Sequence, residues 1–322
     1  KKDSLPLDLH FKTKRIKMLF QKGFLFYAFF NFRLFFILFF RKKDILYAND
    51  LDTLLPNYLV SKLQNKPLIF DSHELFSEVP ELQDNAFAKK VWLFLEDWII
   101  PKLKHVVTVS NGIKNHYNKK YDIKSIVVRN VPEKTKSKTK ELDFISKKQK
   151  VIWYQGSVNL GRGLELVIDT ISFLDDYIFV VAGNGDIFEK LEQKVLHLEL
   201  ENKVKFLGKL SPRELRKFTP NAIIAISLEE DLGLNYRYAL PNKIFDYIHA
   251  EVPMIVSDLP DMSSLVSNYK VGEVLKVRSP KSVSELILKI ENKDYSKALV
   301  KAKKELHWDL EKEKLLKLIK SV

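Results

Sequence analysis

The sequence predicts an α/β protein made of two doubly wound, parallel-sheet domains that face each other across a cleft. Short apolar runs alternate with helical patterns along most of the chain, and this alternation is typical of parallel strands connected by helices. The 322 residues are enough for two domains. A polar, lysine-rich stretch at 136–150 separates two series of such units, and we interpret it as the interdomain linker.

The expected strands fall into two series, one on each side of this linker. The first comprises Ile45–Ala48, Leu68–Phe70, Val106–Val109 and Ile126–Val128. The second comprises Val151–Tyr154, Ile178–Ala182, Val204–Leu207, Ala222–Ser227 and Met254–Ser257. The expected domains are therefore 1–135 and 151–292. C-terminal helices follow over 293–322, and we expect the last of them to pack back on the N-terminal domain.

Helices are expected between these strands. Apolar residues recur at helical spacing over 164–171. Another helix is expected to begin at Ser211, because Pro212 suits the first helical position and Glu214 completes a capping box with the serine.

The composition excludes several classes of protein. With 46% apolar and 12% aromatic residues, the chain is not expected to be intrinsically disordered. It has no cysteine, which excludes disulfide scaffolds, thiolate metal sites and cysteine nucleophiles. The net charge of +13 favours an anionic partner. Nucleic acid is not expected to be that partner, because no helix-turn-helix, zinc-finger or RNP pattern is found.

The segment Phe24–Phe40 is strongly apolar, and nine of its 17 residues are phenylalanine. Three interpretations compete: a helix buried on one side, the same helix lying in a membrane interface, and a transmembrane helix. Arg33 in the middle of the segment counts against the third. Basic residues on both sides favour contact with anionic lipid head groups, so an anionic membrane surface is an expected partner of residues 12–43.

Two glycine-containing loops follow expected strands of the second series. Gly156, Ser157, Gly161 and Arg162 precede a helix start, where free backbone N–H groups and a forked arginine suit a phosphate. The alternative for this loop is a plain strand-to-helix turn with a surface arginine. The second loop begins with Gly183-Asn184, and it either cradles a ligand or simply turns the chain.

The most informative segment lies at Pro241-Asn242-Lys243, just before a helix that also carries Asp246. The backbone N–H groups at the helix start and the charge of Lys243 suit a diphosphate. Asp246 could accept hydrogen bonds from the two hydroxyls of a ribose, although an acidic residue near a helix start is also ordinary helix design.

A fourth motif, Asp71-Ser72-His73-Glu74, ends an expected strand of the first series. Catalytic groups sit at such strand ends, but local capping with an exposed histidine would give the same pattern. No second histidine stands at metal-binding spacing, so no metal site is expected.

From Gly156 to Trp308 the sequence resembles the retaining, GT-B-fold glycosyltransferases of the group 1 (family 4) type. The segments that carry the resemblance are YQGSVNLGRGLELVID, VVAGNGD, KVKFLGKLSPREL, LPNKIFDYIHAEVPMIVSDLPDM and KKELHWDLEKEKLLKLI. In the N-terminal half, DILYAND, DSHELFSE, VTVSNGI and VVRNVPE resemble the acceptor-side domain. The resemblance implies two Rossmann-like domains, and it implies that the family's first strand and glycine-rich loop are missing from this sequence.

The resemblance also implies roles for individual residues. Catalytic roles fall to His73 near the donor sugar and to Arg162 and Lys243 at the diphosphate. Donor binding falls to Gly156, Ser157, Gly161, Gly183, Asn184, Leu207, Pro241, Asn242 and Asp246. Ser157 replaces a basic residue of the family, which makes Lys243 more important. The first glutamate of the family's E-x7-E pair has no clean counterpart, although Glu229, Glu230 and Asp231 are nearby.

The implied function is transfer of a sugar, with retention, from a UDP- or GDP-linked donor to a glycan or lipid-linked acceptor. The expected context is synthesis of cell-surface polysaccharide by a cytoplasmic enzyme at the inner face of the membrane. No cofactor is expected beyond the nucleotide-diphosphate sugar itself. The alternatives are a non-hydrolysing nucleotide-sugar epimerase of the same fold and a non-catalytic, membrane-associated relative.

Overall fold

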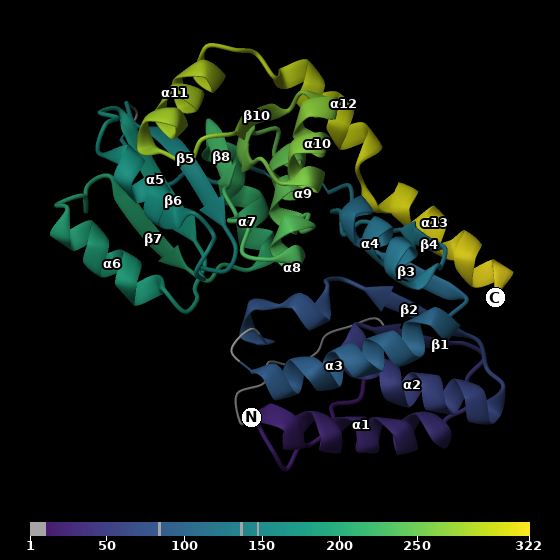
Figure 1. Cartoon of the computed structure of the whole chain (residues 1–322). Helices are drawn as coiled ribbons and strands as arrows, with labels where there is room; N and C mark the ends of the chain where they lie inside the picture. The colour runs from purple at the N-terminus through teal and green to yellow at the C-terminus, as the bar shows by residue number, and fades with distance from the viewer. Residues whose placement is uncertain (1–10, 83–84, 136–137, 147) are drawn as a thin grey trace.

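A computed structural model describes residues 11–82, 85–135, 138–146 and 148–322, which form two α/β units, one above the other in Figure 1. The lower unit has a four-stranded parallel sheet of order β1-β2-β3-β4. The upper unit has a six-stranded parallel sheet of order β10-β9-β8-β5-β6-β7. The expected α/β class with two parallel sheets is thus confirmed.

The strands agree closely with those expected from the sequence. All nine expected strands form, each within two residues of its expected bounds, whereas β10 was not expected because it is short and mostly only half-buried. The strands are β1 (Leu46–Asn49), β2 (Leu68–Ser72), β3 (His105–Thr108), β4 (Ser125–Val127), β5 (Lys150–Gln155), β6 (Tyr177–Ala182), β7 (Val204–Gly208), β8 (Ile224–Ser227), β9 (Met254–Ser257) and β10 (Gly272–Leu275).

Helices connect the strands and cover both sheets. They are α1 (Gly23–Phe39), α2 (Leu51–Gln64), α3 (Ala86–Ile99), α4 (Asn111–Tyr121), α5 (Leu164–Ile171), α6 (Phe188–His197), α7 (Pro212–Phe218), α8 (Leu234–Arg237), α9 (Asn242–His249), α10 (Pro260–Tyr269), α11 (Pro280–Glu291), α12 (Ser296–Glu305) and α13 (Trp308–Ser321). The apolar stripe of 164–171 is buried in the core, and the capping box of Ser211 and Glu214 forms at the start of α7.

The central strands of the upper sheet are covered on both faces. Every residue of β6 is buried, as expected for a parallel sheet packed between helices. Part of the expected linker packs on this unit rather than crossing solvent, because Leu142 is buried in its core and Lys140 donates its backbone N–H to Lys217 O. Residues 136–137 and 147 of that linker lie outside the described residues.

The two terminal helices both lie on the lower unit: α13 connects it to the upper unit, and α1 lies at its surface. The last helix, α13, crosses to the lower unit, where Leu315 and Ile319 pack against Ile69 and Val107. At the other end of the chain α1 lies beside α2 and α3 at the base of the lower unit (Figure 1), and none of its residues is fully buried. Among the described residues, no helix is long and apolar enough to cross a bilayer.

Candidate active site

The order of the upper sheet reverses between β5 and β8, which pair side by side. In open α/β sheets ligands bind in the crevice that such a reversal opens at the carboxyl ends of the strands. The loop after β5 carries Gly156 and Arg162, the loop after β8 carries Glu229, and α9 brings Lys243 to the same place. The structure therefore assembles three of the expected site residues with one that the sequence left unassigned.

A buried charge cluster forms the centre of this crevice. Glu229 is 1% exposed, and its Oε1 lies 2.7 Å from Lys243 Nζ and 3.6 Å from Arg162 Nη1. Its Oε2 accepts a hydrogen bond of 2.7 Å from Ser227 Oγ. Burial alone raises the pKa of Glu229, but Lys243 and Arg162 outweigh it and the net pKa is lowered. Glu229 is therefore an anion that holds two cations in place.

The cluster retains capacity to bind an anion. Arg162 and Lys243 carry two positive charges against the one negative charge of Glu229, so the cluster has a net charge of +1. Within the described residues, the buried Nε of Arg162 has no hydrogen-bond partner. The guanidinium of Arg162 lies over the ring of Tyr236 at 5.1 Å, and the ammonium of Lys243 lies over the ring of Tyr154 at 4.2 Å. The two rings orient the cations without neutralising them.

The glycine loops leave room next to Lys243. Gly156 has φ 134°, and a Cβ placed on it would be 3.9 Å from Lys243 Nζ. A Cβ on Gly183 would collide with the carbonyl oxygen of Gly156, so the two loops touch and only glycine fits there. Asn184 is exposed, and its backbone oxygen accepts the N–H of Val158 at 3.0 Å. Gly183 and Asn184 thus support the first loop by direct contact.

The remaining residues of the first loop and of α9 surround the cluster. Gly161 adopts a φ of 77°, and its carbonyl oxygen accepts the N–H of Glu230 at 2.8 Å, which ties the loops after β5 and β8 together. The carbonyl of Ser157 accepts a hydrogen bond of 2.6 Å from Tyr154 Oη. Pro241 stands at the N-cap position of α9, and Asn242 is the first residue of the helix and is exposed.

Asp246 lies on α9 one turn beyond Lys243 and is fixed by a chain of hydrogen bonds. Its Oδ2 accepts from Gln155 Nε2 at 2.8 Å. The Oε1 of Gln155 in turn accepts from Trp153 Nε1 at 3.0 Å and from Thr219 Oγ1 at 2.8 Å. Burial raises the pKa of Asp246 to about 6. Its side chain is therefore oriented in advance, and one carboxylate oxygen is left over for a ligand hydroxyl.

We expect Asp246→Asn to stabilise the ligand-free protein above pH 6. The folded-state pKa of about 6 exceeds the ordinary 3.8, so the favourable contribution of this carboxyl is full below pH 3.8 and is lost as the pH rises through 6. Asparagine removes that loss, which predicts a gain of about 3 kcal/mol at pH 8 and less than about 1 kcal/mol at pH 4. Urea denaturation at the two pH values measures it. If the free energies of unfolding of the wild type and Asp246→Asn differ by the same amount at both pH values, Asp246 does not have a raised pKa in the folded protein.

His73 lies apart from the charge cluster, at the end of β2 in the lower unit. Its Nε2 is 3.3 Å from Asp71 Oδ2, and its Nδ1 is 3.7 Å from Asp50 Oδ2. The hydrogen bond to Asp71 raises the pKa of His73. The next residue, Glu74, reaches the upper unit instead, because its Oε2 accepts from Asn235 Nδ2 at 3.4 Å. Glu74 therefore connects the end of β2 to the upper unit, whereas His73 contacts two carboxylates of the lower unit.

A cavity of about 310 Å³ lies between the units beside the cluster. Glu74 and Phe76 line it from the lower unit, and Asn159, Arg162 and Tyr236 line it from the upper unit. We call it the Arg162 cavity. Leu207 does not line this cavity. It is half-buried at the end of β7, on the edge of the upper sheet, next to Gly208 with φ 65°.

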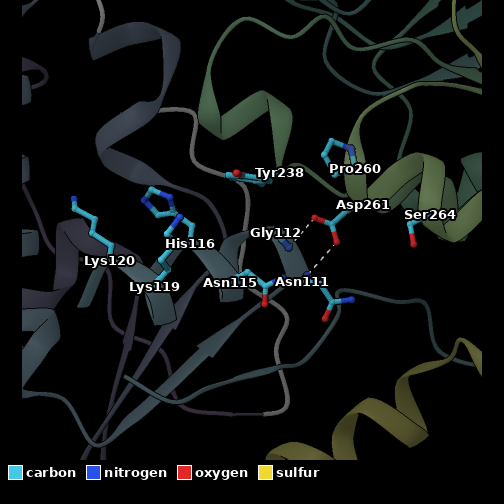
Figure 2. Close-up of a pocket in the computed structure, with 10 residues that line it drawn as sticks. All are labelled: Asn111, Gly112, Asn115, His116, Lys119, Lys120, Tyr238, Pro260, Asp261 and Ser264. Carbon is cyan, nitrogen blue, oxygen red and sulfur yellow. Dashed lines mark hydrogen bonds between the residues drawn. The ribbon is translucent and has the colours of Figure 1, made fainter. Parts of the chain in front are cut away.

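The two units are joined by hydrogen bonds on the side of α4 and α10. Both carboxylate oxygens of Asp261 accept backbone N–H groups of the lower unit, from Asn111 at 3.1 Å and from Gly112 at 2.8 Å (Figure 2). Ser110 Oγ donates to the carbonyl of Tyr238 at 2.8 Å. A Cβ on Gly112 would collide with Asp261 and Tyr238, so this contact requires glycine. A cavity of about 640 Å³ lies here between the units.

We expect Asp261→Ala to loosen the contact between the units. The change removes two charge-assisted hydrogen bonds and leaves the amides of Asn111 and Gly112 without their acceptor, at a cost of about 2–3 kcal/mol. Small-angle X-ray scattering should show a larger radius of gyration, and urea should unfold the variant at lower concentration. Ser264→Ala is the matched control, because Ser264 lines the same cavity but contacts Asn268 of its own helix. Equal effects of both changes would contradict a role for Asp261 in joining the units.

Two family models match this sequence. The model described as glycosyl transferases group 1 matches residues 135–306, which is more than half of the chain. The model described as glycosyltransferase family 4 matches residues 4–132. A curated relative, the O-antigen chain mannosyltransferase RfbU of Salmonella typhimurium, is 29% identical over 199 residues, or 59% of this chain and 52% of that protein. The chain thus spans about half the length of this relative.

Solved structures share the fold at low sequence identity. HepE (Alr3699) of Anabaena, in complex with UDP and glucose, has a TM-score of 0.72 at 15% identity, over 92% of this chain and 82% of that one. The lipopolysaccharide outer core galactosyltransferase WaaB has a TM-score of 0.64 at 16% identity, over 92% and 80%. These likenesses and the two parallel sheets confirm the GT-B architecture expected from the sequence.

Proposed function

Since the chain belongs to the group 1 glycosyl transferases, we propose that it moves a hexose from a UDP-linked donor to a hydroxyl of a glycan or lipid-linked acceptor. The observation that carries the proposal is the Glu229–Lys243–Arg162 cluster at the reversal point of the upper sheet. A group that leaves as a nucleoside diphosphate needs fixed cations at the place where its charge grows. The name of the curated relative and the ligands of HepE support a hexose and UDP, respectively.

In this proposal the donor lies across the carboxyl ends of β5 and β8. Lys243, Arg162 and the helix-start N–H groups of α9 bind the diphosphate. Gly156 lets the diphosphate approach the backbone closely, and Asp246 accepts hydrogen bonds from the ribose. Leu207 and its neighbours at the end of β7 lie beside the base.

The reaction proceeds at the anomeric carbon of the donor, with retention. The bond from this carbon to the diphosphate oxygen breaks, and a bond to the acceptor oxygen forms on the same face. The proton of the acceptor hydroxyl passes to the departing phosphate oxygen. Arg162 and Lys243 stabilise the negative charge that collects on the diphosphate. Glu229 orients both cations, and His73 positions the donor sugar from the lower unit.

We also propose that residues 12–43 rest on an anionic membrane surface, at the cytoplasmic face. Phe24, Phe32 and Phe36 are exposed on α1, at 60%, 61% and 42%. Arg41 and Lys42 follow the helix and are exposed as well. Exposed aromatic residues beside cations are typical of a helix that lies in a membrane interface. Co-sedimentation with vesicles that contain anionic lipid, compared with neutral vesicles, tests this contact.

The transfer is tested by product analysis with and without an acceptor. The protein is incubated with UDP-hexoses and a GDP-hexose, and with octyl hexosides as probe acceptors. We expect UDP release that the octyl hexoside accelerates, and a glycoside with the anomeric configuration of the donor in its NMR spectrum. Epimerisation of the donor sugar in the absence of any acceptor would instead identify a nucleotide-sugar epimerase and contradict the proposal.

A further inference from the structure

Asp50, at the carboxyl end of β1, has a strained backbone. Its φ is 56° and its ψ is 168°, a combination that residues other than glycine rarely adopt. Asn65, Asp122 and Lys270 also have positive φ, but each ends a helix in the ordinary left-handed conformation, with ψ between 42° and 47°. Strain such as that of Asp50 persists only where the surrounding structure holds it, and it is concentrated at functional sites.

The carboxylate of Asp50 does not cap the helix that follows it. Asp50 is the N-cap residue of α2, where an aspartate usually accepts a backbone N–H of the first helical turn, but its side chain makes no such bond. Its Oδ1 instead accepts the backbone N–H of His73 at 2.8 Å. The backbone N–H of Asp50 donates to the carbonyl of Asp71 at 2.9 Å. Both the main chain and the side chain of Asp50 therefore bind the end of β2 and the turn after it, rather than α2.

Residues 73–75, which we call the His73 turn, are held from two sides. Asp50 binds the backbone N–H of His73 from within the lower unit. From the upper unit, Asn235 Oδ1 accepts the backbone N–H of Leu75 at 3.0 Å. The turn belongs to no helix or strand, so these side chains supply the hydrogen bonds that regular structure would otherwise give its backbone.

The His73 turn carries two side chains toward the proposed reaction. Glu74 lines the Arg162 cavity from the lower unit, whereas Arg162 itself lines it from the upper unit. The imidazole of His73 lies beside the residue that holds the turn, with its Nδ1 3.7 Å from Asp50 Oδ2. A displacement of about 1 Å in an active site lowers a rate by about 100-fold. The position of this turn is therefore important for any transfer that takes place in the cavity.

We propose that Asp50 is a positioning residue for the transfer: its strained backbone directs the carboxylate to the His73 turn and so holds His73 and Glu74 in place. This inference rests on the proposed transfer function and assigns a role in it to a residue outside the donor site. Asp50 belongs to the lower unit, whereas Arg162 and Lys243 belong to the upper one, so Asp50 contributes to the rate of transfer and not to the affinity for the donor. The strained backbone is kept because the reaction needs the turn in this position.

Three substitutions separate the backbone of Asp50 from its carboxylate. Asp50→Gly suits the backbone conformation but lacks the carboxylate, and Asp50→Ala lacks the carboxylate and keeps the strain. Asp50→Asn keeps an oxygen that accepts the backbone N–H of His73. Initial rates of hexose transfer to the octyl hexoside give kcat and KM, calorimetry gives the dissociation constant of UDP, and urea denaturation gives the midpoint of unfolding.

We expect kcat to fall about 30- to 100-fold in the glycine and alanine variants, and less than about fivefold in the asparagine variant. The KM of the donor and the dissociation constant of UDP should stay within about twofold of the wild type in all three, which also reports that the upper unit is folded. The glycine variant should unfold at a urea concentration about 0.3–1 M higher than the alanine variant, because glycine relieves the strain.

Asp122→Gly is the matched control. Asp122 has a φ of 50°, is exposed and follows the last residue of α4, so this change also replaces an aspartate by glycine at positive φ. We expect Asp122→Gly to keep kcat within about twofold of the wild type, because its carboxylate lies on the surface.

Wild-type kcat in Asp50→Gly would overturn the proposal, because the carboxylate would then be dispensable. A dissociation constant of UDP that rises as much as kcat falls would overturn it too, since Asp50 would then act on donor binding. Equal urea midpoints of the glycine and alanine variants would show that the backbone of Asp50 is not strained, which also contradicts it. If the wild type transfers hexose while one of these results is found, only the role of Asp50 fails. A wild type that neither binds UDP nor transfers hexose would overturn the proposed function, and the role of Asp50 with it.

Discussion

Replacing Lys243 with alanine is expected to lower the rate of sugar transfer about 100- to 1000-fold, the cost of removing one preorganised charge donor from an active site. The ammonium of Lys243 lies 2.7 Å from Glu229 in a site where both residues are buried. Without it the carboxylate of Glu229 remains beside the diphosphate and repels it. Both the loss of attraction and this repulsion act on the leaving group, so kcat should fall together with affinity for the donor.

Initial rates of UDP release, measured over a range of donor concentrations, separate the two effects. Lys190→Ala is the control, because Lys190 is an exposed lysine on α6 of the same unit. Both substitutions remove one positive charge, so the two variants have the same net charge. We expect this control to keep at least half of the wild-type rate. A Lys243→Ala protein with kcat within threefold of the wild type would exclude Lys243 from the reaction.

Glu229→Gln is expected to destabilise the ligand-free protein by about 3–5 kcal/mol, the usual cost of removing one partner of a buried ion pair. Lys243 is 7% exposed and would be left as a buried cation without the carboxylate that pairs with it among the described residues. The pKa of Glu229 is already lowered, so the carboxylate is charged throughout the neutral range and the effect should not depend on pH between 6 and 8. Urea denaturation followed by circular dichroism measures the loss.

A second variant separates the charge from the packing. If the buried pair is what matters, Glu229→Gln combined with Lys243→Met should recover most of the lost stability, because the buried cation is removed together with its anion and Arg162, whose side chain is 24% exposed, keeps its charge in contact with water. If both the single and the double variant unfold like the wild type, the pair contributes nothing to stability. A double variant less stable than Glu229→Gln would show that the methionine, rather than the charge, governs the result.

Much of the fold follows from local pattern. The nine expected strands are short apolar runs with sharp polar ends, and their helices begin at caps such as Ser211 that act within three residues. The strand β10 escaped prediction because only one of its four residues is buried, so its pattern does not differ from that of a loop. The packing of Leu142 was missed for a related reason: with Phe144 and Ile145 it forms a group of three apolar residues in a lysine-rich stretch, too few to show a helix or strand period.

The site was predictable where backbone shape defines it and unpredictable where distant charges pair. Gly156 and the start of α9 are recognisable from the residues themselves. The role of Glu229, in the loop after β8, depends on a contact with Lys243 of α9, and the orientation of Asp246 depends on Gln155 of β5. His73 was expected near the donor sugar, and the structure adds that Asp50 and Asp71 lie beside it, because two chain segments meet at the carboxyl ends of β1 and β2.

The binding of UDP compared with uridine tests the central claim, a nucleotide-diphosphate site at the reversal of the upper sheet, most directly. Calorimetric titration of the wild type should show UDP binding at least 100-fold more tightly than uridine, which lacks the diphosphate. A UDP concentration 100 times its dissociation constant should raise the free energy of unfolding by about 2.7 kcal/mol. In Lys243→Ala the preference for UDP should fall at least tenfold. A folded wild-type protein that binds neither ligand, or that binds both equally, would contradict the account.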